Sequence, residues 1–550
     1  MQASSAPGSS SGAPAPLPPG DQAGQRHPSA LSPANLVLLA VLSIVGAIIG
    51  IELLVKLGVT PNTSIIGALA AMICARVPLR FFRQYRSVHT QNLAQSAISA
   101  ATFGAANSLL LPIAIPFLFG RPDLVMPMFC GVALGMLLDA YMLYRMFGTN
   151  VFPASGTWPQ GVAAAEAIKA GDEGGKQARL LGLGLGVGAL GSWLGIPMSA
   201  FGTAFIGNIW ALGMLGLGFL IRGYSVPLFH FAIDKAYIPH GMMIGAGLVA
   251  LLQVATMVWR DRHGAVSKTA IDTPRAAAAI RAPGIGKSLR FGGLGYIVIA
   301  AIVAGASGLY GQMSTGMLIG FILYAAFAAF VHELIVGIAA MHSGWFPAFA
   351  VALITLLIGM LLGFPTVSLV ILCGFSAATG PAFADMGYDL KAGFILRGQG
   401  ADPAFELEGR RQQLIAAMIA FLLAIPVVYF AHSAFFANNM IPPVAKVYVS
   451  TIQAGVAPGI MQALLIWAVV GAVLQFLGGP KRQLGVLFAT GLLIASPLAG
   501  WAVLVGIVMR VVIERRGESA RSAMEVFAAG VIAGDALFSF FSSLIRTRSH

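Results

Sequence analysis

Residues 152–171 read FPASGTWPQGVAAAEAIKAG and stand between long apolar segments of the chain. Proline has no backbone N–H and glycine is conformationally permissive, so the prolines and glycines of this stretch predict a break in a helix. These residues are Pro153, Gly156, Pro159 and Gly161. Inside a membrane, backbone groups that lack helical partners need protein, water or a solute to bind them. The stretch therefore predicts an interrupted helix that faces a polar interior.

The composition of the whole chain places it in a lipid bilayer. Of its 550 residues, 57% are hydrophobic and only 10% are charged, and the mean hydropathy is +0.84. A soluble domain carries about 25% charged residues. Apolar runs recur along the chain, and each is long enough to cross a bilayer core. The sequence thus predicts an all-α polytopic membrane protein with about 14 to 16 transmembrane helices, some of them interrupted.

Four regions are predicted along the chain. Residues 1–33 are rich in Pro, Gly, Ala and Ser and form a disordered N-terminal tail. Residues 34–259 form a first transmembrane half and residues 291–546 a second, separated by a basic loop at 260–290 that the positive-inside rule places in the cytoplasm. The same rule places both termini in the cytoplasm. The absence of a recognisable targeting peptide and the Ala-rich composition favour the inner, cytoplasmic membrane of a bacterium.

The two halves share short sequences in the same order. IKAG at 168–171 is matched by LKAG at 390–393, and GMMIGAGL at 241–248 is matched by GVIAGDAL at 530–537. Each of the first pair follows a run that contains proline and glycine. Interrupted helices at matching positions in two halves are a sequence sign of a transport site. The matches predict an internal duplication with a binding site between the halves.

Three stretches resemble the oligopeptide transporter superfamily, including its yellow-stripe-like metal-chelate branch. The stretch at 152–171 is similar to that family's Pro-Ser-Gly-Thr-Ala segment. FADMGYDLKAGFILRG at 383–398 is similar to its Asp-Leu-Lys-Thr-Gly-Tyr-Leu segment, and AAGVIAGDAL at 528–537 to its final glycine-rich segment. The resemblance covers the chain from about residue 34 onward and identifies a bacterial member related to the yellow-stripe-like branch. It implies a secondary transporter that carries small peptides or metal chelates together with protons.

The chain also departs from these relatives. GQGADPAFELEGRRQQ at 398–413 stands where they carry Ser-Pro-Arg, and the Asn-Pro-Gly and Lys-Ile-Pro-Pro-Arg motifs of the fungal and plant peptide branch are missing. The substrate class therefore stays open. We expect proton-coupled symport of small oligopeptides, with a metal-chelate symporter (for siderophore-like or nicotianamine-like complexes) as the alternative and a passive channel as an alternative of another class.

Ionisable residues within apolar segments are candidates for the substrate or proton pathway, because a charge at mid-membrane costs about 2.5 kcal/mol or more. Asp385 and Asp389 lie one helical turn apart, where two charged carboxylates repel each other and favour a shared proton. Glu166 and Lys169 lie three residues apart, either as an ion pair or on the pathway. The full set of candidates, with the polar residues of the first break, is Asp139, Ser155, Gly156, Thr157, Glu166, Lys169, His332, Glu333, Asp385, Asp389 and Lys391.

Each candidate also has a structural interpretation. The break can be a packing kink, Asp385 and Asp389 can form a cap at the membrane edge, His332 can donate to a neighbouring helix, and Asp535 can form an interhelical hydrogen bond. The GxGxxG match at Gly186, Gly188 and Gly191 lies in a spanning segment rather than a βαβ unit, so it predicts close helix packing and not a dinucleotide site.

Other function classes lack their sequence signs. The basic residues behind the net charge of +13 cluster in loops, which argues against nucleic-acid binding. His332-Glu333 is not part of an HExxH motif and there is no Walker motif, so neither a zinc protease nor an ATP-driven pump is expected. No metal or cofactor site is predicted, and the chain is not expected to be an enzyme. The oligomeric state stays open.

Overall fold

The computed structural model describes most of the chain, and in this part the regular structure is helical, with one isolated bridge between Phe147 and Phe152. The described residues are 26–57, 85–173, 175–262, 285–344, 348–455 and 459–548. Most of the predicted tail and most of the loop at 260–290 lie outside them. The apolar run at 61–82, which the sequence predicts to cross the membrane, also lies outside them.

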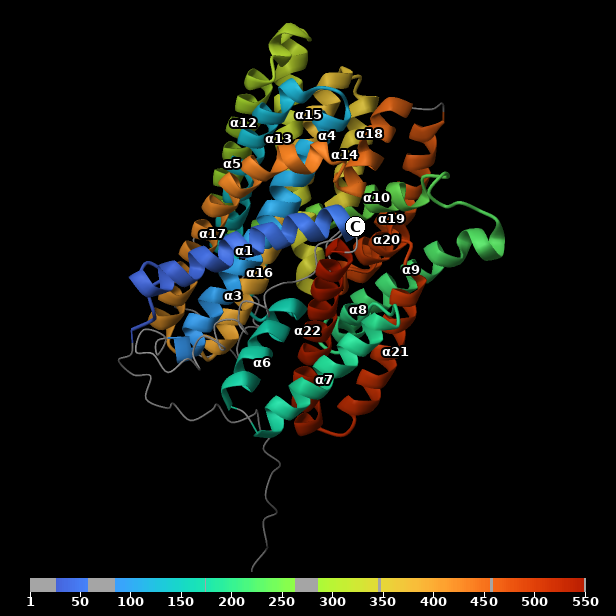
Figure 1. Ribbon diagram of the computed structural model, residues 1–550. Coiled ribbons are helices and arrows are strands. Elements are labelled where there is room, and N and C mark those ends of the chain that lie inside the picture. Colours follow the sequence, from blue (N-terminus) through green and yellow to red (C-terminus); the bar gives the residue numbers. More distant parts are fainter. Residues whose placement is uncertain are drawn as a thin grey trace, which may run out of the picture.

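The described helices are arranged as Figure 1 shows. In chain order they are α1 (Pro33–Leu57), α3 (Val88–Phe103), α4 (Leu111–Leu118), α5 (Val125–Met146), α6 (Pro159–Glu173), α7 (Gly175–Trp193), α8 (Met198–Ala204), α9 (Ile209–Phe229), α10 (Ile238–Arg262), α12 (Ile285–Ala306), α13 (Thr315–Ser343), α14 (Ala348–Leu361), α15 (Thr366–Ala378), α16 (Pro381–Leu396), α17 (Pro403–Ala437), α18 (Pro443–Ala454), α19 (Ile460–Arg482), α20 (Leu484–Leu493), α21 (Pro497–Glu514) and α22 (Glu518–Arg548).

Ten segments of the described residues are long and apolar enough to cross a membrane. Two of them are the most deeply enclosed, Val88–Leu118 and Thr366–Leu396. In each, 94% of an apolar 18-residue stretch is buried inside the protein. Three shorter apolar helices accompany them, at Ile238–Ala250, Val351–Leu361 and Leu484–Leu493. The predicted all-α polytopic membrane fold is confirmed, and the two enclosed segments form the centre around which the site is built.

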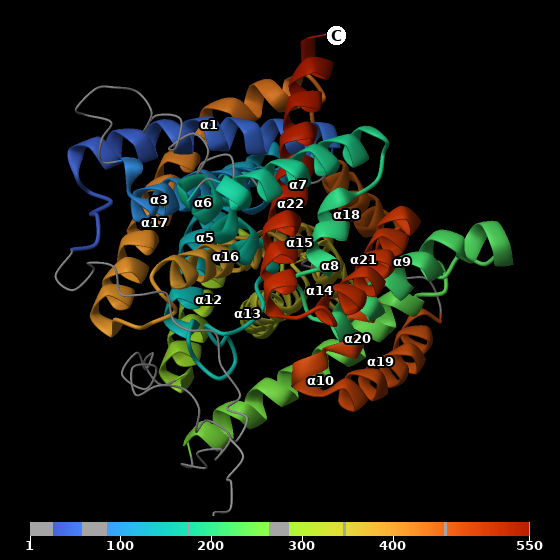
Figure 2. The same ribbon diagram turned by 90° about the horizontal axis from the view of Figure 1, so that it is seen from below.

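Two hydrophobic cores hold the helices together. The larger combines α1, α3, α4, α5 and α12 with α13–α18, and the second combines α8, α9, α10, α20 and α21 with parts of α13 and α14. Helix α13 serves both, because Leu334 and Val336 pack in the first core and Ile335 and Ala339 in the second. Figures 1 and 2 accordingly show α3, α5, α12 and α17 on one side of the molecule, α9, α10, α19 and α20 on the other, and α13 between them.

Helices far apart in sequence pack in reciprocal pairs. Helix α7 lies along α22 and α10 lies along α19, while α8 contacts α21 and α9 contacts α20. Glycines permit the close approach, since a methyl group at Gly188 would lie 2.2 Å from the carbonyl oxygen of Val531, and one at Gly245 would lie 1.7 Å from that of Ala468. The glycine-bearing sequences at 241–248 and 530–537 thus belong to two equivalent helix interfaces. The predicted packing role is confirmed for Gly188 and Gly191 of α7, but it is wrong for Gly186, where a methyl group would meet no atom within 4 Å.

Two glycines of α7 provide a test of this packing. Gly188→Ala is expected to lower the stability of the protein by roughly 1–3 kcal/mol, because the new methyl group overlaps the backbone of α22. Gly186→Ala, on the same helix, places its methyl group where no atom lies within 4 Å and should leave stability unchanged or slightly raised. Thermal unfolding of both variants in detergent checks this. Equal unfolding temperatures for the two variants would contradict the packing assignment.

Candidate functional site

The first break is an irregular segment between α5 and α6 that is anchored to the end of α13. The backbone N–H of Trp158 donates to the carbonyl oxygen of Met341 at 2.8 Å, and the Thr157 hydroxyl donates to the same oxygen. Within the segment, the Gly156 N–H donates to the carbonyl oxygen of Pro153 at 2.8 Å, while Ser155 is exposed. Several backbone groups of the break are therefore satisfied by protein, which holds the segment in a defined conformation.

The second break separates α15 from α16 at Thr379 and Gly380. Gly380 has φ = +100°, a backbone conformation that favours glycine, and Pro381 begins the next helix. The Gly380 N–H donates to Oδ2 of Asp139 at 2.7 Å. A candidate acid of α5 thus binds the backbone group that this break leaves without a helical partner.

The two breaks lie next to each other. Nζ of Lys391 on α16 donates to the carbonyl oxygen of Ala154 in the first break at 3.0 Å. Helix α6 packs against α16 so closely that a methyl group at Gly161 would lie 2.4 Å from the carbonyl oxygen of Tyr388. The ring of Trp158 meets the ring of Tyr388 edge-on, with centroids 5.9 Å apart. Helices α6 and α16, which follow the first and the second break, therefore lie side by side (Figures 1 and 2).

Asp385 and Asp389 project from α16 toward polar residues of α3. The Ser99 hydroxyl donates to Oδ1 of Asp385, and the side-chain amide of Gln95 donates to Oδ1 of Asp389. Both side chains are buried, and Oδ2 of each has no hydrogen-bond partner among the described residues. None of the ion pairs in the described part of the chain involves either carboxylate. Each acid therefore keeps one buried oxygen available for a proton or a cationic group.

The polar face of α3 was not among the residues predicted from sequence. Its buried members are Asn92, Gln95, Ser96, Ser99 and Thr102. They recur at helical spacing within an apolar span, and that periodicity was the available signal. The helix then continues as a π-helical segment at Gly104–Leu110 before α4 begins. Such segments inside α-helices frequently occur at functional sites.

A second acidic cluster joins three helices. The hydroxyl of Tyr296 on α12 contacts Oδ1 of Asp139 on α5 and lies 2.7 Å from Oε2 of Glu333 on α13. All three side chains are fully buried. The neighbouring His332 points elsewhere, with its Nδ1 3.3 Å from the Ser376 hydroxyl. The structure thus brings Asp139 and Glu333 together through a tyrosine that sequence reasoning missed, and it separates His332 from them.

The remaining predicted acids already have partners. Glu166 and Lys169 on α6 form an ion pair with 3.0 Å between Oε1 and Nζ, and their side chains are 16% and 30% exposed. Asp535 accepts hydrogen bonds from the Ser192 hydroxyl and from the Ser199 N–H, the latter at 2.7 Å near the start of α8. The geometry favours the structural interpretation for Asp535, which satisfies a helix N-terminus.

An unpredicted ion cluster lies within the segment that departs from the resembled family. Glu406 binds Arg397 through two hydrogen bonds of 2.7 and 3.2 Å and Arg410 through one of 2.6 Å. Gln413 links this cluster to the site, since it accepts from Arg397 at 2.7 Å and donates to the carbonyl oxygen of Asp389 at 2.6 Å. The cluster fixes the end of α16 against α17. The residues of the cluster are close in sequence, but a charged and polar stretch gives no sign that they are buried.

The residues before α1 are anchored beside this ion cluster. The Ala30 N–H donates to the side-chain oxygen of Gln412 at 2.8 Å, and the His27 ring packs against His89 and Phe405. Burial lowers the pKa of His27 to about 4, so the ring is neutral near pH 7. The start of the first spanning helix is thereby attached to α17.

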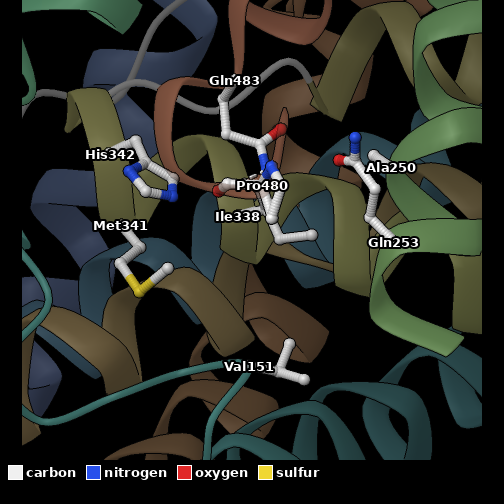
Figure 3. A pocket seen from close by; sticks show the side chains of 8 residues that line it. All are labelled: Val151, Ala250, Gln253, Ile338, Met341, His342, Pro480 and Gln483. Atoms are coloured by element: carbon white, nitrogen blue, oxygen red, sulfur yellow. Dashed lines mark hydrogen bonds between the residues drawn. The ribbon is translucent and has the colours of Figure 1, made fainter. Parts of the chain in front are cut away.

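A small cavity of about 20 Å³ lies between the two sides of the molecule (Figure 3). Its wall includes Val151 of the first break and Met341 and His342 at the end of α13. Gln253 of α10 and Gln483, which follows a kink at Gly479, provide carboxamide groups. In the view of Figure 3, Gln253 and His342 lie on opposite sides of the cavity and Val151 at one end. The cavity has room for about one water molecule, so it is a narrow seam rather than an open chamber.

Comparison with known families agrees with this architecture. A family model described as OPT oligopeptide transporter protein matches residues 31–233 and 230–546 of the chain. Among curated proteins, no match was found. The matched segments contain both breaks, both acidic clusters and all ten membrane-crossing segments. The chain is therefore a multi-pass membrane protein that belongs to the OPT oligopeptide transporter family.

Proposed function

We propose that this protein is a proton-coupled symporter that carries small oligopeptides across the bacterial cytoplasmic membrane. The observation that carries the proposal is the pair Asp385 and Asp389, buried without a cationic partner on the helix whose Lys391 holds the first break. Buried acids within a membrane are costly unless they bind a proton or a cation. A transporter that exchanges protons for substrate has a use for such groups.

The chemistry of a small peptide fits the region where the breaks meet. Its terminal ammonium is a donor for the free oxygens of Asp385 and Asp389, and its amides are complementary to backbone groups of the first break and to the exposed hydroxyl of Ser155. The π-helical segment at Gly104–Leu110 contacts α16, and the seam lined by Gln253 borders the first break at Val151. We assign the ion pair of Glu166 and Lys169 to the edge of this pathway.

Alternating access is supported by the reciprocal helix pairs. The pairing is the one expected for two related units that meet face to face. The pairs are α7 with α22, α10 with α19, α8 with α21 and α9 with α20. In transporters built from repeats, one unit rocks against the other around a fixed site. The central α16 touches α3, α5, α6 and α13, so a change in its position reaches both sides of the molecule.

Uptake into proteoliposomes tests the proposed coupling. With an inward proton gradient as the only driving force, labelled di- to pentapeptides are expected to accumulate, because protonation of buried acids outside and release inside links the two flows. An ionophore that collapses the gradient should abolish accumulation but leave the equilibration of peptide unaffected. Accumulation that persists with the ionophore would exclude proton coupling.

Competition experiments separate the alternatives. A series of unlabelled di- to pentapeptides and of metal–siderophore complexes identifies the substrate class, since only true substrates reduce uptake of the label at similar concentrations. Currents far above carrier turnover would instead indicate a passive channel. Labelling of introduced cysteines from either side of the membrane tests the proposed cytoplasmic location of both termini.

A further inference from the structure

In the cluster of Asp139, Tyr296 and Glu333, the number of oxygen–oxygen contacts shows that one carboxyl group is protonated. A phenol has one hydrogen to donate, yet the Tyr296 oxygen contacts carboxyl oxygens of both Asp139 and Glu333. If both acids were ionised, one of these contacts would place two oxygen lone pairs against each other in a fully buried site. At least one of the two carboxyl groups must therefore carry a proton.

The surrounding hydrogen bonds identify which acid carries the proton. Both oxygens of Asp139 accept, one from the Tyr296 hydroxyl and the other from the Gly380 N–H, as suits a carboxylate. Oε1 of Glu333 has no hydrogen-bond partner among the described residues. If Glu333 were ionised, that buried oxygen would carry charge without a hydrogen bond, at a high cost in free energy. If Glu333 is protonated, the same atom is a neutral carbonyl oxygen, and burying it without a partner costs much less. Glu333 is thus the acid, and it donates to the Tyr296 oxygen.

We propose that this cluster holds the coupling proton and that Tyr296 relays it between Glu333 and Asp139. This rests on the proposed function as a proton-coupled transporter. In the relay, Glu333 gives its proton to the Tyr296 oxygen while Tyr296 gives its own to Asp139. Tyr296 is unchanged by the exchange, Glu333 becomes the carboxylate, and Asp139 becomes the acid. One proton has moved from α13 to α5, and no other reactant is needed.

The relay is connected to the substrate region through the second break. As a carboxylate, Asp139 accepts a charge-assisted hydrogen bond from the Gly380 N–H, and this bond weakens when Asp139 receives the proton. Gly380 immediately precedes α16, which carries Asp385, Asp389 and Lys391. Protonation of Asp139 therefore loosens the start of the helix that holds the first break. This provides a physical link between proton movement and the binding region.

No cation neutralises the cluster among the described residues, since none of the ion pairs there includes Asp139 or Glu333. Helices packed against α5, α12 and α13 carry other titratable and charged groups, but the hydrogen bonds of the cluster involve none of them. On α5, α13 and the helices packed against them, these groups include Tyr141, Tyr144 and Arg145 of α5, Tyr324, His332 and His342 of α13, Glu166 and Lys169 of α6, Arg222 of α9, His240 of α10, Cys373 of α15, Asp385, Tyr388, Asp389 and Lys391 of α16, and Glu406, Arg410, Tyr429 and His432 of α17.

Two variants and a matched control test the relay. Tyr296→Phe removes the relaying hydroxyl and Glu333→Gln removes the acid, while Tyr324→Phe removes a tyrosine hydroxyl of α13 that donates only to the backbone oxygen of Thr355 at 2.9 Å. Proton-driven accumulation is expected to fall at least about tenfold in the first two variants, as loss of a hydrogen bond to a charged group implies, but not in the control. Peptide exchange at equal pH on both sides should be retained in all three.

Infrared spectroscopy gives a second readout that does not depend on transport. The wild-type protein should show the C=O stretching band of a buried carboxylic acid, which Glu333→Gln should remove, Tyr296→Phe should shift and Tyr324→Phe should leave in place. If Glu333→Gln fails to fold, the comparison of the two tyrosine variants still decides the question. A band that is the same in Tyr296→Phe and the wild type overturns the relay.

Transport measurements distinguish the relay from the broader proposal. If the wild type shows no proton-driven accumulation, the proposed function is wrong whatever the variants do. If the wild type and Tyr296→Phe accumulate peptide equally in response to the gradient, proton coupling stands and the relay is wrong.

Discussion

Asp385→Asn is expected to reduce proton-driven peptide uptake by at least about tenfold, the scale expected for losing a hydrogen bond or ion pair to a charged group. The amide oxygen of asparagine can still accept from the Ser99 hydroxyl, so the contact between α16 and α3 is kept. The variant loses the second carboxylate oxygen, which is buried without a partner and is the one available for a proton or an ammonium group. The loss should therefore affect transport far more than folding.

A surface acid serves as the control for this experiment. Asp123→Asn removes one carboxylate charge from an exposed pair with Arg121 outside the site and should leave uptake unchanged. Uptake by both variants, and by Asp389→Asn, is measured in proteoliposomes at equal protein content, with unfolding temperatures recorded in detergent. Full activity in both Asp385→Asn and Asp389→Asn would remove these carboxylates from the pathway. A fall in activity that simply follows a fall in stability would assign them to folding.

Local chemistry made the breaks and the isolated acids predictable. Proline and glycine are unusual within an apolar run, and so are carboxylates in the middle of one, because a spanning helix needs paired backbone groups and apolar side chains. A short stretch of sequence is therefore enough to recognise them. The partners of these acids were not predictable in the same way. Tyr296 reaches Asp139 and Glu333 only through the arrangement of separate helices, and nothing in its own surroundings in the sequence marks it. Ser99 and Gly380 had local signals, in the polar periodicity of α3 and in the second break, but those signals do not say which acid each one binds.

The match between the halves shows a second limit of sequence reasoning. The prediction aligned IKAG at 168–171 with LKAG at 390–393, yet both lie in helices, α6 and α16, that pack against each other. The reciprocal pairs favour another register, in which α7–α10 correspond to α19–α22. IQAG at 452–455 then precedes α19 as IKAG precedes α7, and each string lies at the end of a helix that begins with proline. Short alanine- and glycine-rich strings recur by chance, so they cannot decide which helices of the two halves correspond. Helix packing can decide this.

Glu406→Gln is expected to lower the free energy of unfolding by roughly 3–5 kcal/mol, because it leaves two buried guanidinium groups without their carboxylate. Arg397 and Glu406 are fully buried and Arg410 nearly so. Arg397 donates to both oxygens of Glu406, at 2.7 and 3.2 Å, and Arg410 donates to Oε1 at 2.6 Å. The amide of glutamine has one accepting oxygen where the carboxylate has two, carries no charge, and turns an N–H donor toward a guanidinium group. Gln413 hydrogen-bonds both Arg397 and the backbone of Asp389, so the disturbance should also reach the acid site.

Glu408, two residues along the same helix, is the matched control. Its pair with Arg411 has 3.7 Å between nitrogen and oxygen, and the two side chains are 42% and 66% exposed. An exposed pair contributes about 0–1 kcal/mol, so Glu408→Gln should unfold close to the wild-type temperature. Thermal and denaturant unfolding in detergent compare the two variants under identical conditions. If Glu406→Gln were as stable as Glu408→Gln, the buried ion cluster would not be what holds the end of α16 to α17. The stretch at 398–413 would then be available for the substrate-binding role that we assign to the breaks.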